Sequence, residues 1–115
     1  MRGGWRIALG LALAAAGAAR AADVSKACDV GPVTRNFGGA PWLVYSCHDT
    51  SRLLFVAPPV NPAAPGTIVL SRAGGMLHID SVSTGDRRVV AEAGAAILGL
   101  APEEFDALIG QTKAP

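Results

Sequence analysis

The sequence predicts an α+β domain in which an antiparallel sheet precedes two helices. Between residues 42 and 82, short runs rich in β-branched and aromatic residues are separated by turn-forming residues, which is typical of strands. After residue 86 the apolar spacing changes to the helical period. Because the strands come first, we expect a four-stranded meander with both helices packed on one face.

The central element is a predicted hairpin over residues 42–56. Residues 42–47 (WLVYSC) and 52–56 (RLLFV) flank the turn-forming tetrapeptide HDTS. The first strand has apolar residues on both faces, so we expect helices to cover one face and the preceding segment to cover part of the other. Its two faces are Leu43, Tyr45 and Cys47 on one side, and Trp42, Val44 and Ser46 on the other.

Residues 57–66 contain four prolines and predict a loop, because proline cannot donate to a strand ladder. Residues 67–72 and 76–82 are the third and fourth predicted strands, joined by a tight turn. In the fourth, Leu77 and Ile79 face inward, whereas His78 and Asp80 face outward.

Two helices complete the predicted fold. Val89, Ala93 and Ile97 recur at helical spacing, which predicts a helix over residues 86–98 that Gly99 ends. Pro102 suits the first position of a second helix, because a missing N–H costs nothing there. The buried stripe of this second helix is Phe105, Leu108 and Ile109.

The first 21 residues have the pattern of a secretory signal peptide. Arg2 and Arg6 precede an apolar run over residues 7–19, and an A-x-A site predicts cleavage between Ala21 and Ala22. The run has 13 residues, too few for a bilayer that needs about 20. A retained membrane anchor and a lipoprotein are the alternatives, and Lys26 argues against acylation of Cys28.

Cleavage leaves a single domain over residues 22–115, without a membrane anchor. Its 9 acidic residues exceed its 7 basic ones, because three of the 10 lysines and arginines lie in the signal peptide. A net charge of −2 gives no electrostatic reason to bind nucleic acid or anionic lipid. The expected location is the periplasm or the exterior of a bacterial cell.

Two cysteines in an exported chain predict one disulfide, Cys28–Cys47. It would hold an irregular arm, residues 28–40, whose expected core contact is Phe37, and which little else would fix. Two free thiols are the alternative, and a metal site is less favoured because no further ligand stands at zinc-binding spacing.

Two His/Asp pairs, His78 with Asp80 and His48 with Asp49, have side chains that could bind zinc or act as a general base. Both stand where a one-sided sheet places polar residues, so we expect a structural role. The sequence has no G-x-S-x-G, H-E-x-x-H or P-loop. We therefore expect neither catalytic residues nor a metal or other cofactor.

The segment STGDRR, residues 83–88, is the candidate binding site. Two arginines in the first turn oppose the helix dipole, and such a local conflict can mark function. Free N–H groups and guanidinium groups would suit an anionic ligand or an acidic partner. The candidate residues are Ser83, Thr84, Gly85, Arg87 and Arg88; solvated arginines, with Arg88 paired to Glu92, are the alternative. The proline-rich loop is a second possible recognition surface.

Three segments, WLVYSC from Trp42, NPAAP from Asn61 and STGDR from Ser83, resemble small exported bacterial proteins to which no activity is assigned. A weaker resemblance, in Tyr45-Ser46-Cys47 and residues 81–85, is to periplasmic C-type lysozyme inhibitors of the MliC type. That family's small β-barrel ends in strands, whereas two helices are expected here. We expect a non-catalytic binding protein, whose partner is an envelope protein or a small anionic ligand; the alternatives are an enzyme inhibitor and a small hydrolase or metal-binding protein.

Overall fold

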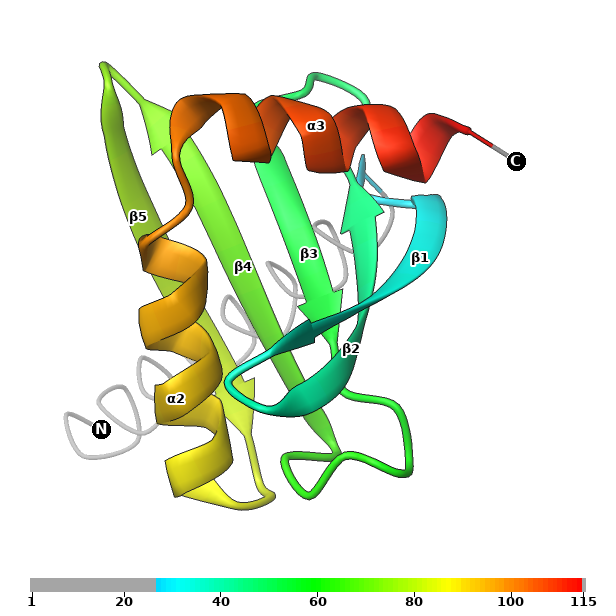
Figure 1. Ribbon diagram of the computed structural model, residues 1–115, viewed down its shortest axis with the longest axis vertical. Helices are drawn as coiled ribbons and strands as arrows, with labels where there is room; N and C mark the ends of the chain where they lie inside the picture. The colour runs from blue at the N-terminus through cyan, green and yellow to red at the C-terminus, as the bar shows by residue number, and fades with distance from the viewer. Residues whose placement is uncertain (1–26, 115) are drawn as a thin grey trace, which may run out of the picture.

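The computed structural model describes residues 27–114 as a five-stranded antiparallel sheet with two C-terminal helices (Figure 1). The strands lie in the sheet in chain order: β1 (Val30–Phe37), β2 (Ala40–Ser46), β3 (Arg52–Val56), β4 (Gly66–Ala73) and β5 (Met76–Ser83). The helices are α2 (Arg87–Leu98) and α3 (Pro102–Lys113). The α+β class is confirmed, and the predicted signal peptide with its cleavage site between Ala21 and Ala22 lies outside the described residues.

The predicted count of four strands is wrong, because the segment expected to be an irregular arm contains β1. This edge strand pairs antiparallel with β2 along its length, with an irregularity between Val30 and Val33. Gly31 and Pro32 indicate a loop in the sequence, but a bulged edge strand tolerates both residues. The arm is therefore held by backbone pairing as well as by its cysteine.

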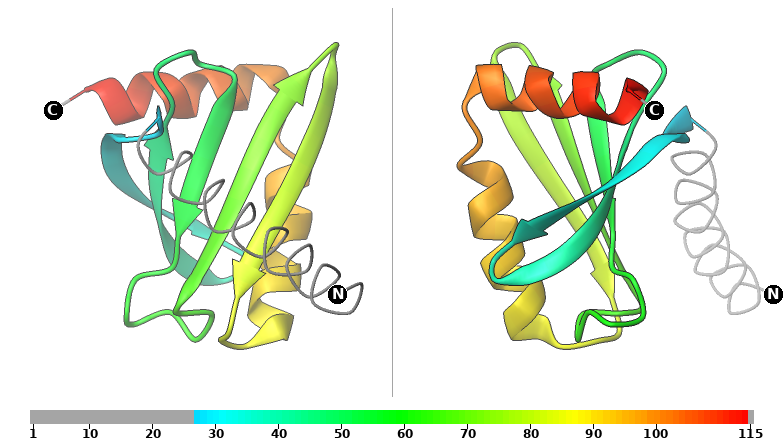
Figure 2. Two further views of the ribbon diagram at one scale, coloured as in Figure 1. Left: turned by 180° about the vertical axis from the view of Figure 1, so that it is seen from behind. Right: turned by 45° about the vertical axis from the view of Figure 1, so that its right-hand side comes forward.

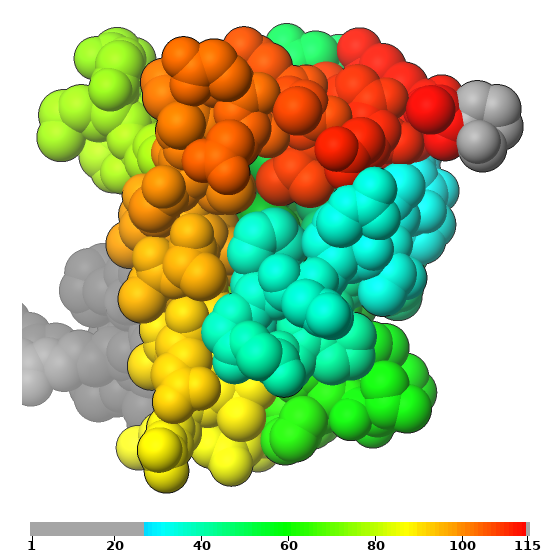
Figure 3. Space-filling model, in the orientation of Figure 1, coloured from blue at the N-terminus to red at the C-terminus, as the bar shows by residue number. Residues whose placement is uncertain are grey.

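The strands curl so that β1 approaches the helices. Figure 3 shows β1, α2 and α3 together covering one side of the sheet. The ring of Phe37 packs edge-on against that of Phe55, with centroids 5.3 Å apart, which confirms Phe37 as a core contact. The largest buried apolar side chains of this core are Trp42, Phe55, Phe105, Leu53, Ile68, Leu70, Ile97 and Val44.

A buried pair of hydroxyls fixes the end of α3 on β2. The Thr112 hydroxyl donates to the carbonyl oxygen of Ile109 over 2.6 Å, so it accepts from the Ser46 hydroxyl, also at 2.6 Å. Both residues are at most 5% exposed. Because both hydroxyl groups have an acceptor for their proton, this polar contact carries little of the desolvation penalty of an unpaired group.

The tip of the β1–β2 hairpin lies close to the backbone of α2, and a substitution there tests this contact. Gly38 has φ +61, and a Cβ there would lie 2.6 Å from the Ala93 backbone nitrogen of α2. We expect Gly38→Ala to lower the free energy of unfolding by about 2–4 kcal/mol, through backbone strain and a clash that no rotamer relieves. Urea denaturation monitored by Trp42 fluorescence measures the change.

Gly39→Ala is the matched control. Gly39 also has positive φ (+79), but a Cβ there meets nothing within 4 Å. It should cost only about 1–2 kcal/mol of strain. Equal losses in the two variants would contradict the close contact between this hairpin and α2.

Candidate functional site

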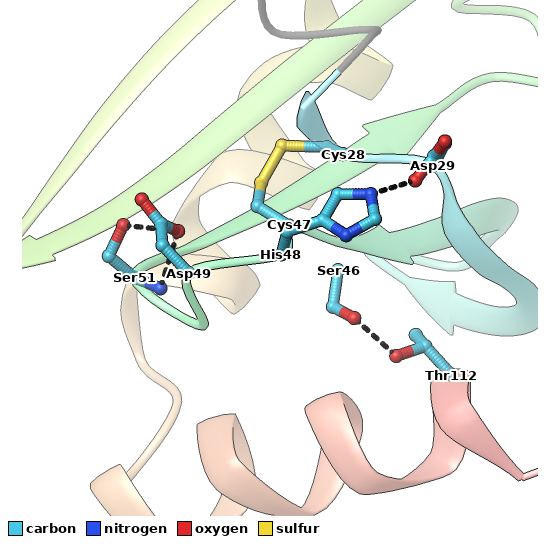
Figure 4. The surroundings of a disulfide bond; sticks show 8 residues. All are labelled: Cys28, Asp29, Ser46, Cys47, His48, Asp49, Ser51 and Thr112. Atoms are coloured by element: carbon cyan, nitrogen blue, oxygen red, sulfur yellow. Dashed lines mark hydrogen bonds and ion pairs between the residues drawn. A yellow bond between two sulfur atoms is a disulfide. The ribbon is translucent and has the colours of Figure 1, made fainter.

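The disulfide between Cys28 and Cys47 is present, as predicted, and joins the start of β1 to the end of β2 (Figure 4). The residues that follow the two cysteines also contact each other: His48 Nε2 lies 2.5 Å from Asp29 Oδ1, with both side chains more than 60% exposed. The backbone N–H of His48 donates to the carbonyl oxygen of Ala27. These contacts link the same two segments as the disulfide.

His48 and Asp49, adjacent in sequence, do not act as a pair. Asp49 turns away from His48 and accepts hydrogen bonds from Ser51 (Figure 4). The Ser51 N–H and hydroxyl both bond to Asp49 Oδ1, over 3.1 and 2.8 Å, and lower the pKa of Asp49 below its ordinary value of 3.8. This geometry stabilises the turn and leaves the carboxylate ionised.

His78 and Asp80 lie exposed on the outward side of β5, two residues apart on the same face. In the described part of the chain, no three His, Cys, Asp or Glu side chains are grouped so that they could hold a metal ion. Neither α2 nor α3 has the length and apolarity that a membrane-spanning helix requires.

The candidate residues Ser83, Thr84 and Gly85 hold the proline-rich loop. The Ser83 hydroxyl donates to the carbonyl oxygen of Ala63 over 2.8 Å and accepts from the Gly85 N–H. The Thr84 N–H donates to the carbonyl oxygen of Pro65. A Cβ on Gly85 would lie 2.5 Å from the Ala63 carbonyl group, so the glycine permits this close approach.

Asn61 belongs to the proline-rich loop, is 2% exposed and fixes the loop by hydrogen bonds of its side chain. Its side-chain amide donates to the carbonyl oxygen of Pro41 over 2.7 Å, and its Oδ1 accepts from the Ala63 N–H. The proline-rich loop is therefore a fixed connector that packs on β2 and on the segment before α2.

The N-terminus of α2 already has an anionic partner within the chain. The Asp86 carboxylate accepts from the backbone N–H groups of Arg88 (2.9 Å) and Val89 (3.4 Å). Arg88 Nε lies 3.3 Å from Glu92 Oε1, which is the pairing expected if the arginines do not bind a ligand. Arg87 is exposed and lines a groove between α2 and β5. Anion binding at this loop stays a prediction. The backbone N–H groups of Arg88 and Val89 would contribute little to it, because Asp86 already accepts their hydrogen bonds.

The face of the sheet away from the helices is unusually apolar. Strand register aligns two rows of side chains across β2–β5 on this face, which we call the outer rows. The first row is Leu43, Val56, Thr67 and Val82, and the second is Tyr45, Leu54, Val69 and Asp80. Ala27 and the disulfide pack against the second row, around Leu54, while Val82 is 74% exposed. Figure 2, left, views the sheet from this side.

Sequence reasoning identified apolar residues on both faces of β2 but did not assemble the rows. A row requires strand register, which follows from the turn lengths between strands. The two-residue turn of β4–β5 was the signal that could have placed Val69 opposite Asp80 and Thr67 opposite Val82.

Comparisons of the chain with protein-family models, with curated proteins and with solved structures find no match.

The disulfide closes a loop with a sequence separation of 19, and this length determines how much its removal lowers the free energy of unfolding. The double substitution Cys28→Ser with Cys47→Ser should lower the free energy of unfolding by about 3 kcal/mol. Amide hydrogen exchange should still show protected β1 amides, because backbone pairing to β2 remains. Two titratable thiols in the denatured wild-type protein, or loss of all β1 protection in the variant, would contradict this.

The capping role of Asp86 is tested by Asp86→Ala. Losing a side-chain cap should destabilise the protein by about 1 kcal/mol, whereas Asp86→Ser keeps a capping oxygen and should cost less. Urea denaturation measures both variants. Equal stability of the alanine variant and the wild type would show that the carboxylate does not hold the start of α2.

Proposed function

We propose that this chain is an exported, non-catalytic binding domain that recognises a protein of the bacterial envelope or exterior through the outer rows. The supporting observation is the apolar character of those rows: six of the eight residues are apolar, and all six except the buried Leu54 are at least partly exposed. An antiparallel sheet with helices on one face ordinarily presents polar residues on the other. Contiguous apolar surface outside the core commonly marks an interaction site.

The surroundings of the rows have the composition of a protein interface. Tyr45 and the aliphatic side chains form an apolar centre, and the next row toward the β2–β3 turn is polar: Arg52, Ser71 and His78. An apolar centre with a polar margin is the usual arrangement where two proteins meet. The partner we propose therefore presents apolar side chains of its own, rather than phosphate or other anions.

The disulfide supports the proposed location. Disulfides form and persist in oxidising compartments, such as the periplasm or the cell exterior. The predicted signal peptide points to the same compartment.

Site-specific photo-crosslinking in intact cells tests this proposal. A photoreactive phenylalanine derivative placed at Thr67 or Val69, in the middle of the rows, should give an adduct of one defined mass. The same probe at Glu103 or Ala107, exposed on α3, should not. Val69→Lys should lower the yield from position 67 about tenfold or more, the effect of losing roughly 1.4 kcal/mol of binding free energy.

Ala107→Lys is the matched control, since it adds the same charge to the exposed side of α3. It should leave the adduct from position 67 unchanged. The proposal fails if helix positions crosslink as strongly as the rows, if the rows give no adduct, or if Val69→Lys has no effect.

A further inference from the structure

The two edges of the sheet differ in how they are protected. At β1, Pro32 and the irregularity between Val30 and Val33 interrupt regular pairing, and Arg35 Nε donates to Gln111 of α3. At β5, all eight residues pair regularly with β4, and the strand has neither a proline nor a lysine. Natural sheets usually protect an exposed edge strand with a proline, a lysine or an irregularity in pairing, because an open strand readily pairs with another chain. Figure 1 shows β5 as the outermost strand beside α2.

We propose that β5 is a homodimer interface, at which a second copy of the chain pairs its own β5 antiparallel through a two-fold axis at Ile79. This surface is separate from the centre of the outer rows, so the proposal does not depend on the function proposed above. It would join two five-stranded sheets edge to edge.

The hairpin geometry determines which backbone groups of β5 face outward. Ala73 and Met76 flank the two-residue turn Gly74-Gly75, and such flanking residues exchange both hydrogen bonds. The even-numbered residues of β5 then form the hydrogen bonds to β4. The N–H of Thr84, which donates to Pro65 on the β4 side, follows the same alternation. Leu77, Ile79 and Ser81 therefore direct their N–H and C=O groups away from β4.

Side-chain charge selects the register. With Ile79 opposite its own copy, His78 lies opposite Asp80 of the second copy, and this contact occurs twice. A shift by one residue at the axis would place His78 opposite His78, so that it loses its carboxylate partner, or would place Asp80 opposite Asp80, and like charges directly opposite each other are destabilising. The same register pairs Met76 with Val82, which are 63% and 74% exposed in the single chain.

The groove between α2 and β5 provides a second, independent observation. It has a volume of about 580 Å³, and its walls include Ile79 and the small residues Ala91, Gly94 and Ala95 of α2. Leu98, at the end of this helix face, is 43% exposed. In the proposed register, Ile79 of the second copy lies beside Ile79 on the helix side of the sheet. The second copy would therefore bury apolar surface next to the open edge.

Sedimentation equilibrium of the protein, as secreted and oxidised, tests the proposal over concentrations up to about 1 mM. We expect a reversible monomer–dimer equilibrium, since one strand from each copy makes a small interface. Ser81→Pro removes an outward-facing N–H without removing a bond to β4, and should weaken the dimer at least tenfold. Ser81→Ala retains the N–H and should dimerise like the wild type.

A charge swap identifies the register independently of proline. His78→Glu and Asp80→Lys should each weaken dimerisation at least threefold, because the first places two carboxylates opposite each other and the second removes the carboxylate that faces His78. The double variant restores opposite charges and should return to within about twofold of the wild type. A wild-type protein that stays monomeric, a dimer unaffected by Ser81→Pro, or single variants that the double variant does not rescue would each overturn the proposal.

Discussion

The fold depends on the need to cover both faces of β3. Leu53 and Phe55 are buried on one face and Leu54 on the other, in a strand of five residues. Neither face can be left in water without losing roughly 1.5–3 kcal/mol for each large apolar side chain. The helices and the curled β1 cover the first face. On the second face, Ala27 and the disulfide cover one end, and the outer rows extend from there across the sheet.

Elements with strong periodicity could be predicted from the sequence, and those held mainly by tertiary contacts could not. The β2–β3 hairpin, the two later strands and both helices have the spacing that their faces require. β1 lacked that signal because Gly31 and Pro32 stand near its start, and because Arg35 separates Val33 from Phe37 on the same face. Fewer side chains of an edge strand are buried than in an interior strand, so fewer of them need to be apolar. The sequence of β1 therefore resembles that of a loop.

The segment before α2 shows a related limit. The sequence predicts a ligand-binding role for Ser83, Thr84 and Gly85, because they precede a helix that begins with two arginines. In the structure, the Ser83 hydroxyl and the Thr84 N–H donate to the carbonyl oxygens of Ala63 and Pro65, about 20 residues earlier in the chain. A contact between distant segments leaves no local pattern, whereas the Arg88–Glu92 pair, within one helix, was predictable from its spacing. The unfavourable placement of the arginines is compensated by Asp86, whose carboxylate bonds to the first helical N–H groups.

The hydrogen bond from His48 to Ala27 decides where additional polypeptide can be attached without obstructing a surface. Ala27 lies against the second of the outer rows, so a fluorescent protein or affinity handle fused just before it would emerge next to Tyr45 and Val69. Lys113 lies at the far end of α3, on the opposite side of the sheet (Figure 1). A fusion at the C-terminal end would leave the apolar face accessible, and immobilisation through that end would present this face to solution.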